Sequence, residues 1–529
     1  MTNSPPKHAM VCQVASLATR LTTAFAAGLT VFALNAPALA QGGKAAAGTG
    51  TSGPVQTFAC DKLAGRNIAG AAILSSEVIG ATAGLPEYCR LRGLIDPKLN
   101  FELRLPTAAA WNGKLHYGGG GGYNGAVPAL NGPALRKGFA QVSSDSGHQG
   151  SALDASFVLG DPQAAALFGN LSVPTVMGVA RTIVHQYYHH PIRRAYFEGC
   201  SNGGREALIQ VQRHPWLFDG VIARAPAYNW VGIMGAFNRT AKALVAPGGA
   251  MSTAKVDRLA NAVLAACDAA DGVADGLVSN PQACHFDPAT LRCPGGGDTG
   301  NTCLSDAQLA VVKSWTDPAT FGSGRWRNAG WPLSGNENAP GAWDRWVSSG
   351  PRLQFLFSDT TIKYYLAQDP AANSLLYDYE SNLAGLLTMS ALNDATDATI
   401  QPFIGMGGKL ILWHGTNDAA LSYRTTTEYY DRVVASVGGR ANADHFLRYY
   451  LAPGVNHCAG GPGADGTDLL AALDEWVVNG KAPGTMQAAR VDGTGATVIS
   501  RPLCVYPQYA RYKGSGDPMS ASSFTCVAP

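Results

Sequence analysis

The sequence has few charged residues and no block of charge of one sign. Asp, Glu, Lys and Arg make up 14% of its 529 residues, against about 25% in an average soluble domain. Without a basic stripe, the chain lacks the electrostatic surface that nucleic acids and anionic membranes require. Hydrophobic residues reach 46%, so the apolar-poor composition of disordered chains is absent too. We therefore expect a large folded core and no nucleic-acid partner.

The first 40 residues are typical of a secretory signal peptide. Lys7 and Arg20 precede an apolar run over 21–34, and Ala38-Leu39-Ala40 forms a small-residue cleavage site. A membrane anchor is the alternative, but the run is shorter than the ~20 residues that a membrane span needs. No later stretch is predicted to cross a bilayer. We expect a flexible leader over 41–54 and an exported protein, periplasmic or secreted, with no membrane partner once the signal is removed.

The sequence has no Cys-x-x-Cys pair, which argues against a structural zinc site. Ten cysteines remain beyond residue 40, and an even number in an exported chain favours disulfides. The shortest pairings are Cys60–Cys89, Cys267–Cys284, Cys293–Cys303 and Cys504–Cys526. They leave Cys200 and Cys458, which are far apart in the sequence.

Predicted strands and helices alternate along two parts of the chain, as in an α/β protein with a mostly parallel sheet. The predicted strands are 101–105, 114–117, 139–143, 194–198, 220–223, 409–413 and 446–451. The predicted helices are 173–188, 204–213, 428–437 and 469–478. Between residues 228 and 397 the alternation stops, and Trp, Pro, Gly and Cys become frequent. We predict one core, 55–227 with 398–529, interrupted by an inserted domain over 228–397.

A nucleophile elbow is predicted at Gly199-Cys200-Ser201-Asn202-Gly203, which matches G-x-S-x-G between a strand and a helix. The two glycines permit the sharp turn that exposes the serine hydroxyl. The start of the following helix offers backbone N–H groups to a developing oxyanion. A glycine-rich packing turn is the alternative.

A serine nucleophile needs a base and an orienting acid, which follow it in the order acid, then histidine, on this kind of sheet. Asp418 lies in a loop after the strand 409–413, and His457 lies in a loop after the strand 446–451. His414 is the second candidate base, although it precedes the acid. His445 directly precedes a strand and fits a structural or surface role better.

The two unpaired cysteines support the same choice. Cys200 directly precedes Ser201, and Cys458 directly follows His457. If the serine and the histidine are in contact, their neighbours lie near the Cα separation of ~4.4–6.8 Å that a disulfide needs. A bridge there would tie nucleophile and base together covalently.

Three segments of the chain resemble the tannase/feruloyl esterase family, which also includes mono(2-hydroxyethyl) terephthalate hydrolases. They are the elbow G-C-S-N-G-G-R, the loop P-G-V-N-H-C-A-G-G-P-G, and the tail from Arg501 to Asp517. The resemblance covers about residues 55–529. It implies an α/β-hydrolase fold with a large inserted lid, the triad Ser201–Asp418–His457, and a Cys200–Cys458 disulfide.

The resemblance also implies an oxyanion hole and a metal site. The oxyanion donors map to the backbone of Gly122, at the end of a run of five glycines, and of Asn202. A calcium site maps to the lid, with the carboxylates of Asp268, Asp271 and Asp275 and the carbonyls of Val273 and Leu277. Hard oxygen ligands suit Ca²⁺, and the distance in sequence from Ser201 indicates a structural ion. A solvated Asp-Gly turn is the alternative.

We predict a serine esterase that cleaves small-molecule esters of aromatic acids, of feruloyl or galloyl type, through an acyl-enzyme. The first alternative is hydrolysis of a phthalate-type monoester. Enzymes with that activity hold the free carboxylate with a lid arginine, for which Arg345 and Arg352 are the candidates, and carry a phenylalanine where this chain has Leu421. A binding protein without catalytic activity is the alternative from another class. Aromatic lid residues that could hold the acyl group are Trp326, Trp331, Trp343, Trp346, Phe355 and Phe357.

Overall fold

The structure is a computed structural model that describes residues 59–348 and 352–529. The chain divides into two units, 1–53 and 54–529, and every described residue belongs to the second. The predicted signal peptide and the whole of the predicted leader lie outside the described residues.

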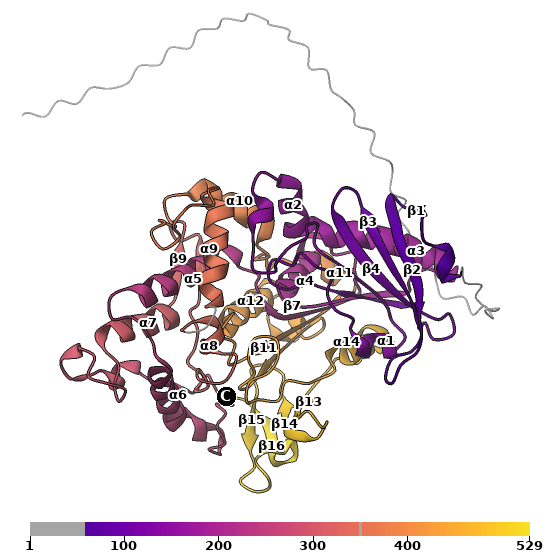
Figure 1. Ribbon diagram of the computed structural model, residues 1–529. Helices are drawn as coiled ribbons and strands as arrows, with labels where there is room; N and C mark the ends of the chain where they lie inside the picture. The colour runs from indigo at the N-terminus through magenta and orange to yellow at the C-terminus, as the bar shows by residue number, and fades with distance from the viewer. Residues whose placement is uncertain (1–58, 349–351) are drawn as a thin grey trace, which may run out of the picture. The chain divides into compact units, whose positions relative to one another are not determined.

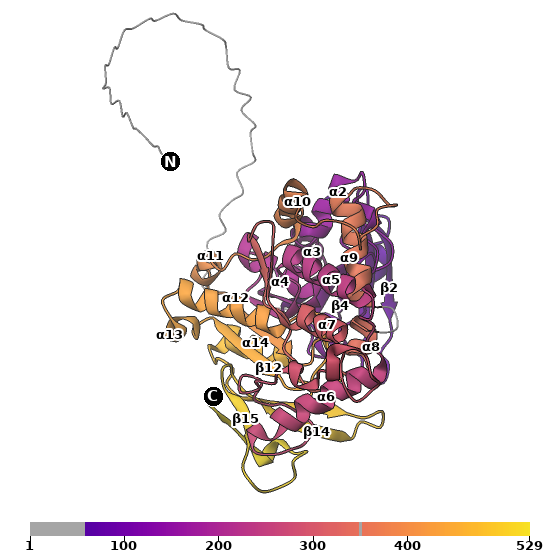
Figure 2. The same cartoon turned by 90° about the vertical axis from the view of Figure 1, so that its left-hand side faces the viewer.

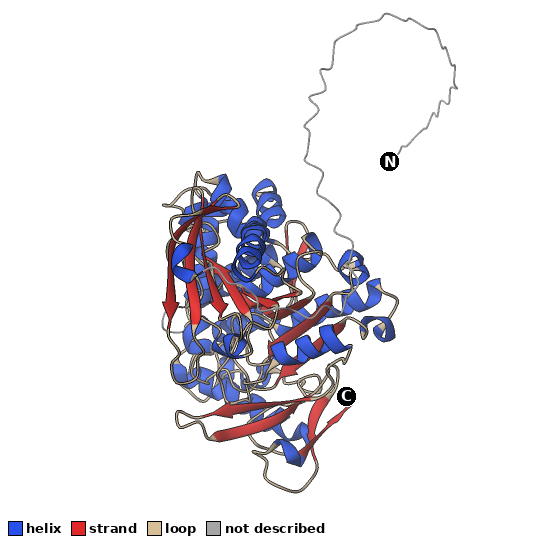
Figure 3. Ribbon diagram, turned by 90° about the vertical axis from the view of Figure 1, so that its right-hand side faces the viewer, coloured by secondary structure: helices blue, strands red, loops and turns tan. Residues whose placement is uncertain are grey.

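A ten-stranded mixed sheet forms the centre of the fold (Figure 3). Its strand order is β1-β2-β3-β4-β6-β5-β7-β8-β11-β12. The strands are β1 (Asn67–Ile68), β2 (Ala71–Ile79), β3 (Tyr88–Ile95), β4 (Leu99–Pro106), β5 (Lys114–Gly118), β6 (Ala140–Ser144), β7 (Arg194–Ser201), β8 (Gly220–Pro226), β11 (Lys409–Gly415) and β12 (Leu447–Ala452).

Only part of the sheet is parallel. The six strands from β6 to β12 run parallel, and β1 to β4 add antiparallel hairpins at the β6 edge. The prediction of a mostly parallel sheet is thus right for the strands that follow residue 114 and misses β1–β3. In β2 the apolar Leu74 and Val78 are exposed and polar residues lie between them, so that strand gives no clear alternating pattern.

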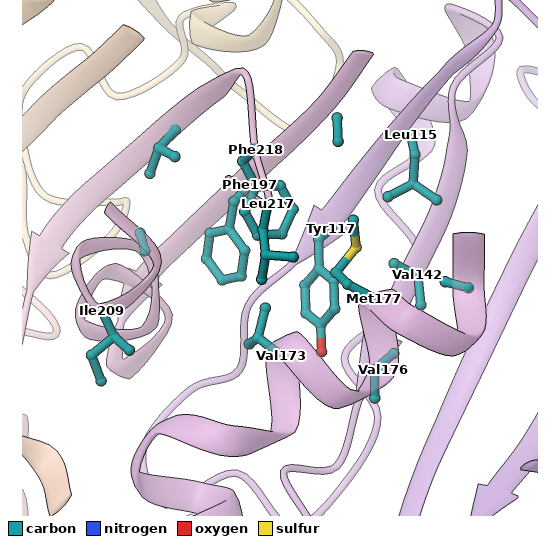
Figure 4. Close-up of a cluster of buried hydrophobic side chains, with 14 of the residues drawn as sticks. Leu115, Tyr117, Val142, Val173, Val176, Met177, Phe197, Ile209, Leu217 and Phe218 are labelled. Carbon is teal, nitrogen blue, oxygen red and sulfur yellow. The ribbon is translucent and has the colours of Figure 1, made fainter. Parts of the chain in front are cut away.

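Helices cover both faces of the sheet. On one face, α3 and α4 pack on alternate strand residues such as Leu115, Tyr117 and Phe197 (Figure 4). On the other, α14 packs on the intervening residues, among them Tyr196 and Ile222. The helices flanking the sheet are α1 (Gly132–Arg136), α2 (Pro162–Ala166), α3 (Ser172–Tyr188), α4 (Asn202–Arg213), α11 (Gln401–Gly405), α12 (Tyr423–Ser436), α13 (Arg440–Ala443) and α14 (Leu469–Asn479).

The segment 228–397 is called the insertion below, and none of its described residues forms a strand of the large sheet. Helices α5, α7 and α9 pack together there (Figures 1 and 2). Its elements are α5 (Trp230–Val245), α6 (Thr253–Cys267), α7 (Asp306–Thr316), β9 (Ala319–Phe321), β10 (Trp326–Asn328), α8 (Trp343–Trp346), α9 (Leu353–Thr361) and α10 (Leu383–Asn393). Its apolar cluster includes Tyr123 and residues 419–421 of the flanking core, so the insertion shares its interior with the loops around the large sheet.

Two small antiparallel sheets follow α14 near the C-terminus. They are formed by β13 (Met486–Val491) with β14 (Thr497–Leu503) and by β15 (Tyr509–Tyr512) with β16 (Phe524–Val527). The Cys504–Cys526 disulfide links the residue after β14 to β16. The sequence analysis did not predict these strands.

One helical stretch meets the length and hydropathy of a membrane span, contrary to our expectation. It runs from Pro162 to Tyr188, and 61% of its most apolar window is buried inside the fold. Because α3 packs on β4 and β6, its apolar residues serve the core of this sheet.

Candidate active site

Ser201 ends β7 and directly precedes α4, so the predicted strand–turn–helix context is present. Its backbone has φ 63° and ψ −120°, a combination that a non-glycine residue adopts only under strain. This turn lifts the side chain out of the sheet while the N-terminus of α4 points toward it.

The glycines around Ser201 are required by close backbone contacts. A Cβ on Gly199 would lie 2.5 Å from the carbonyl of Gly203, and a Cβ on Gly203 would lie 2.8 Å from the oxygen of Gly120. Since real Cβ atoms do not approach backbone so closely, neither position tolerates a side chain. The motif thus lets β7, α4 and the glycine run after β5 converge at Ser201.

His457 and Asp418 lie side by side, in loops after β12 and β11. His457 Nδ1 is 2.8 Å from Asp418 Oδ2, which leaves Nε2 on the opposite edge of the ring. Trp346 packs edge-on against the His457 ring, with centroids 5.1 Å apart, and it also lines the pocket that contains Ser201. The structure therefore pairs the predicted acid with the predicted base, and the Cys200–Cys458 disulfide joins the residues next to Ser201 and His457.

The carboxylate of Asp418 is buried and held by several donors. The N–H groups of Ala420 and Leu421 donate to its Oδ1, each at 2.8 Å. Burial opposes ionisation, but His457 and His414 together keep the pKa of Asp418 well below its ordinary value. The acid is therefore ionised wherever the protein is folded near neutral pH.

His414, the second candidate base, faces away from the pocket. Its Nε2 is 3.2 Å from Asp418 Oδ2, and its Nδ1 is 2.9 Å from the hydroxyl of Thr426. The ring is fully buried and does not line the Ser201 pocket. His414 thus supports the acid, a role that its position near the end of β11 did not reveal.

Gly122 and Asn202 lie with Ser201 in the wall of one pocket, as the oxyanion prediction requires. A buried carboxylate that the sequence analysis missed connects their segments. Glu206 accepts hydrogen bonds from the N–H of Gly120 at 3.0 Å and from Asn202 Nδ2 at 3.2 Å. Burial raises its pKa. Only the i, i+4 spacing to Asn202 could have pointed to Glu206.

The pocket at Ser201 is small and apolar, with a cavity volume of about 30 Å³. Such a volume admits a water molecule. The other lining residues are Ala227, Trp230, Ile233, Met234, Phe237, Trp346, Phe357, Ala420 and Leu421.

Two of the six predicted lid aromatics, Trp346 and Phe357, form part of this wall. Trp326, Trp331 and Trp343 are buried in the core of the insertion, and Phe355 lines a separate cavity with Arg352. Neither Arg345 nor Arg352 is among the described residues that line the Ser201 pocket.

The ten cysteines beyond residue 40 form five disulfides, and each pairs as predicted. Cys200 and Cys458 are joined with their Cα atoms 5.9 Å apart. This bond links the residue before Ser201 to the residue after His457. Five disulfides are typical of a protein that functions in an oxidising compartment outside the cytoplasm.

The acidic loop predicted to bind calcium begins in the 3₁₀ turn Asp268–Asp271. Asp268 accepts backbone hydrogen bonds from Gly276 at 2.8 Å and from Leu277 at 3.1 Å. Asp275 forms a buried ion pair with Arg501. Across the described residues, no three His, Cys, Asp or Glu side chains are grouped closely enough to hold a metal ion.

Asp271 stands out in this loop. Its Oδ2 is buried without a hydrogen-bond partner. Burial, together with the charges of Asp275 and Asp268, raises its pKa to about 6. Three carboxylates in eight residues and an unpartnered buried oxygen have the donor chemistry that suits a hard cation.

Comparison with known proteins agrees with this geometry. The family described as "Tannase and feruloyl esterase" matches residues 77–527. A mono(2-hydroxyethyl) terephthalate hydrolase from Piscinibacter sakaiensis is 34% identical, over 85% of this chain and 86% of its own. A probable feruloyl esterase from Arthroderma benhamiae is 30% identical, over 82% of this chain and 83% of its own. The crystal structure of an esterase from Aspergillus oryzae superposes with a TM-score of 0.80 at 25% identity, covering 88% of this chain and 99% of that one.

The mixed sheet and its strand–turn–helix serine define a carboxylic ester hydrolase with an α/β-hydrolase fold. The chain belongs to the tannase and feruloyl esterase family.

The Cys200–Cys458 disulfide predicts a coupled loss of stability and turnover. Replacing both cysteines by alanine removes a cross-link that spans 258 residues, and chain entropy alone predicts a loss of about 5 kcal/mol. Because small displacements between nucleophile and base are costly, kcat should also fall, by about tenfold. Calorimetry and steady-state kinetics on the folded variant measure the two effects.

The matched control is Cys504→Ala with Cys526→Ala. That disulfide closes a loop of 22 residues near the C-terminus. Its removal should lower the free energy of unfolding by about 3 kcal/mol and leave kcat unchanged. Unchanged kcat in the Cys200/Cys458 variant would contradict a positional role for that bond.

Proposed function

We propose that Ser201 is the nucleophile of a serine esterase whose substrates are esters of aromatic acids. The observation that carries this proposal is the pocket in which Ser201, Gly122 and Asn202 face a wall of aromatic and aliphatic side chains. Aromatic rings pack favourably against such side chains. No charged side chain lines the pocket among the described residues, which favours an uncharged acyl group.

The reaction follows from the positions of the groups. His457 accepts the proton of Ser201 at Nε2 as Oγ attacks the ester carbonyl carbon. The backbone N–H groups of Gly122 and Asn202 stabilise the oxyanion, and His457 then protonates the departing alcohol. Water, deprotonated by His457, attacks the acyl-enzyme, and His457 returns the proton to Ser201 Oγ as the acid departs. Asp418 fixes the imidazole with its proton on Nδ1 and stabilises the imidazolium.

Hydrolysis of a terephthalate-type monoester is the second candidate function. It is favoured by the 34% identity to the enzyme of Piscinibacter sakaiensis, whose name states that activity. The pocket favours it less, because a free carboxylate would enter an apolar space without a cation to pair with.

We propose further that the chain is exported by a signal peptide in residues 1–40. The support comes from the sequence pattern described above and from the five disulfides, which form in oxidising compartments.

We also propose that the acidic loop binds a structural Ca²⁺. The carboxylates of Asp268, Asp271 and Asp275 and the carbonyls of Val273 and Leu277 would hold it, and the three carboxylates would have to move closer together than they lie in this structure. Its charge would stabilise the ionised form of Asp271, which burial and its acidic neighbours otherwise disfavour. The ion has no part in the reaction at Ser201.

The nucleophile is tested with a fluorophosphonate probe and a substrate panel. Ser201→Ala should abolish labelling and lower kcat at least about a thousandfold, as loss of a triad serine does elsewhere. Ser156→Ala, an exposed serine, is the control and should behave as wild type. Labelling that persists in Ser201→Ala would overturn the assignment, and a wild-type protein that takes no label would point to a binding protein.

Substrate preference is measured as kcat/KM on methyl ferulate, methyl gallate and mono(2-hydroxyethyl) terephthalate. We expect the uncharged aromatic acyl esters to exceed the terephthalate monoester by about tenfold or more, because burying an unpaired carboxylate is costly. The reverse order would support the second candidate function. Hydrolysis confined to short aliphatic esters would contradict both.

Calcium binding predicts a pH-dependent gain in stability. With a folded pKa near 6 and an ordinary value of 3.8, Asp271 favours the folded state below pH 3.8 and loses that contribution as the pH rises through 6. Calcium should therefore raise Tm more at about pH 7.5 than at about pH 5, as scanning calorimetry in Ca²⁺ and in EDTA measures.

Two variants distinguish calcium binding at this loop from a general effect of salt on Tm. Asp271→Asn should lose the calcium response, whereas Asp306→Asn, which breaks an exposed ion pair with Arg292, should keep it. A wild-type Tm that does not change between Ca²⁺ and EDTA would show that the loop does not bind the ion.

A further inference from the structure

An asparagine directly precedes both the acid and the base of the proposed triad. Asn417 precedes Asp418, and Asn456 precedes His457. Their side chains are hydrogen-bonded to each other, with Asn417 Nδ2 donating to Asn456 Oδ1 at 2.6 Å. Both residues are buried, and neither lines the Ser201 pocket. We call these two side chains the amide pair.

The amide pair connects loops that the sheet alone does not hold together. The Asp418 loop follows β11, and the His457 loop follows β12. Asn417 also donates its backbone N–H to the carbonyl of Val455 at 3.0 Å. The two loops are therefore joined one residue behind the bond between His457 and Asp418, by contacts that do not involve either of those side chains.

A segment of the insertion secures the amide pair from the other side. The hydroxyl of Ser334 donates to Asn417 Oδ1 at 2.5 Å, and Asn417 Nδ2 donates to the carbonyl of Asn336 at 3.0 Å. Asn456 Nδ2 donates to the carbonyl of Pro340 at 2.9 Å. Each amide is thus fixed by the partner amide and by the segment 334–340.

The segment 334–340 is itself anchored at two points. Glu337, a buried carboxylate, accepts a hydrogen bond from the N–H of Ser334, and its Oε1 lies 3.1 Å from the Ser334 hydroxyl oxygen. Asn336 Nδ2 donates to the carbonyl of Gly276 at 3.0 Å, and Gly276 belongs to the acidic loop. These hydrogen bonds tie the segment 334–340 to the acidic loop, while Asn336 Oδ1 and Glu337 Oε2 are buried without a partner.

We propose that Asn417 and Asn456 are positioning residues for the acid–base pair. The amide pair holds the two loops at the separation that lets His457 Nδ1 meet Asp418 Oδ2, and so fixes the tautomer that leaves Nε2 ready to take a proton. The role rests on the proposed function, since it acts through Asp418 and His457. A shift of the loops by less than 1 Å would lengthen that hydrogen bond and slow proton transfer.

The test uses Asn417→Ala, Asn456→Ala and the double variant in the full-length enzyme. Each single change should lower kcat about 10- to 100-fold with KM within about twofold. Because the two side chains act as a unit, the double variant should lose little more than either single variant. The low-field proton resonance of the His457 Nδ1–H···Asp418 hydrogen bond should weaken or move upfield in all three.

Asn238→Ala is the matched control. Asn238 is a buried asparagine whose amide donates to the carbonyl of Ser374 at 2.9 Å, away from the triad. Its loss should lower Tm, yet keep kcat and the low-field resonance. If an alanine variant of the amide pair does not fold, Ser334→Ala removes one bond to Asn417 and should produce the same spectral change with a smaller loss of kcat.

Folded variants that keep kcat within twofold and retain the low-field resonance would overturn the positioning role. Failure of the proposed function has a different signature, because it would leave activity in Ser201→Ala. If Ser201→Ala abolishes activity while Asn417→Ala and Asn456→Ala leave kcat unchanged, Ser201 remains the nucleophile and only the positioning role is wrong.

Discussion

The rest of this structure depends on one constraint, which is that the turn at Ser201 and the loop at His457 must lie next to each other. The nucleophile ends β7, and the base follows β12, with the whole insertion between them in sequence. Parallel strands bring their carboxyl ends to one edge of the sheet, which places the loops near each other but does not set their spacing. The Cys200–Cys458 disulfide, the glycine contacts of the elbow and the hydrogen bond between His457 and Asp418 provide that closer control.

Two buried carboxylates lie next to the site, and each accepts hydrogen bonds from neighbouring groups. Asp418 lies between His457 and His414, and Glu206 is bonded to both segments of the predicted oxyanion hole. In a low-dielectric interior, such carboxylates are favourable only where donors surround them. The same donors fix the geometry of the loops that carry them. Each of these hydrogen bonds therefore both stabilises a buried charge and positions a loop.

The sequence was most informative where chemistry requires particular neighbours. The Asp418 loop and the cysteines beside Ser201 and His457 predicted the acid–base pair and the disulfide that the structure contains. Apolar runs predicted the strands of the large sheet from β4 to β8, together with β11 and β12. It was least informative where contacts join distant residues of ordinary type. Asn417, Asn456 and Ser334 meet only in the folded chain, and β2 lacks a clear apolar pattern. The choice of Trp346 and Phe357 over Trp331 for the pocket wall depends on the path of α8 and α9.

The apolar wall of the Ser201 pocket is also part of the interior of the insertion. Trp230, Phe357 and Leu421 contribute to one continuous buried cluster with the helices around them. A substitution that widens the pocket therefore removes packing from that interior, at a cost of a few kcal/mol for each large side chain. A change of substrate range would therefore require compensating substitutions elsewhere in the insertion. The packing of its other buried aromatic residues supplies the stability that such a change removes.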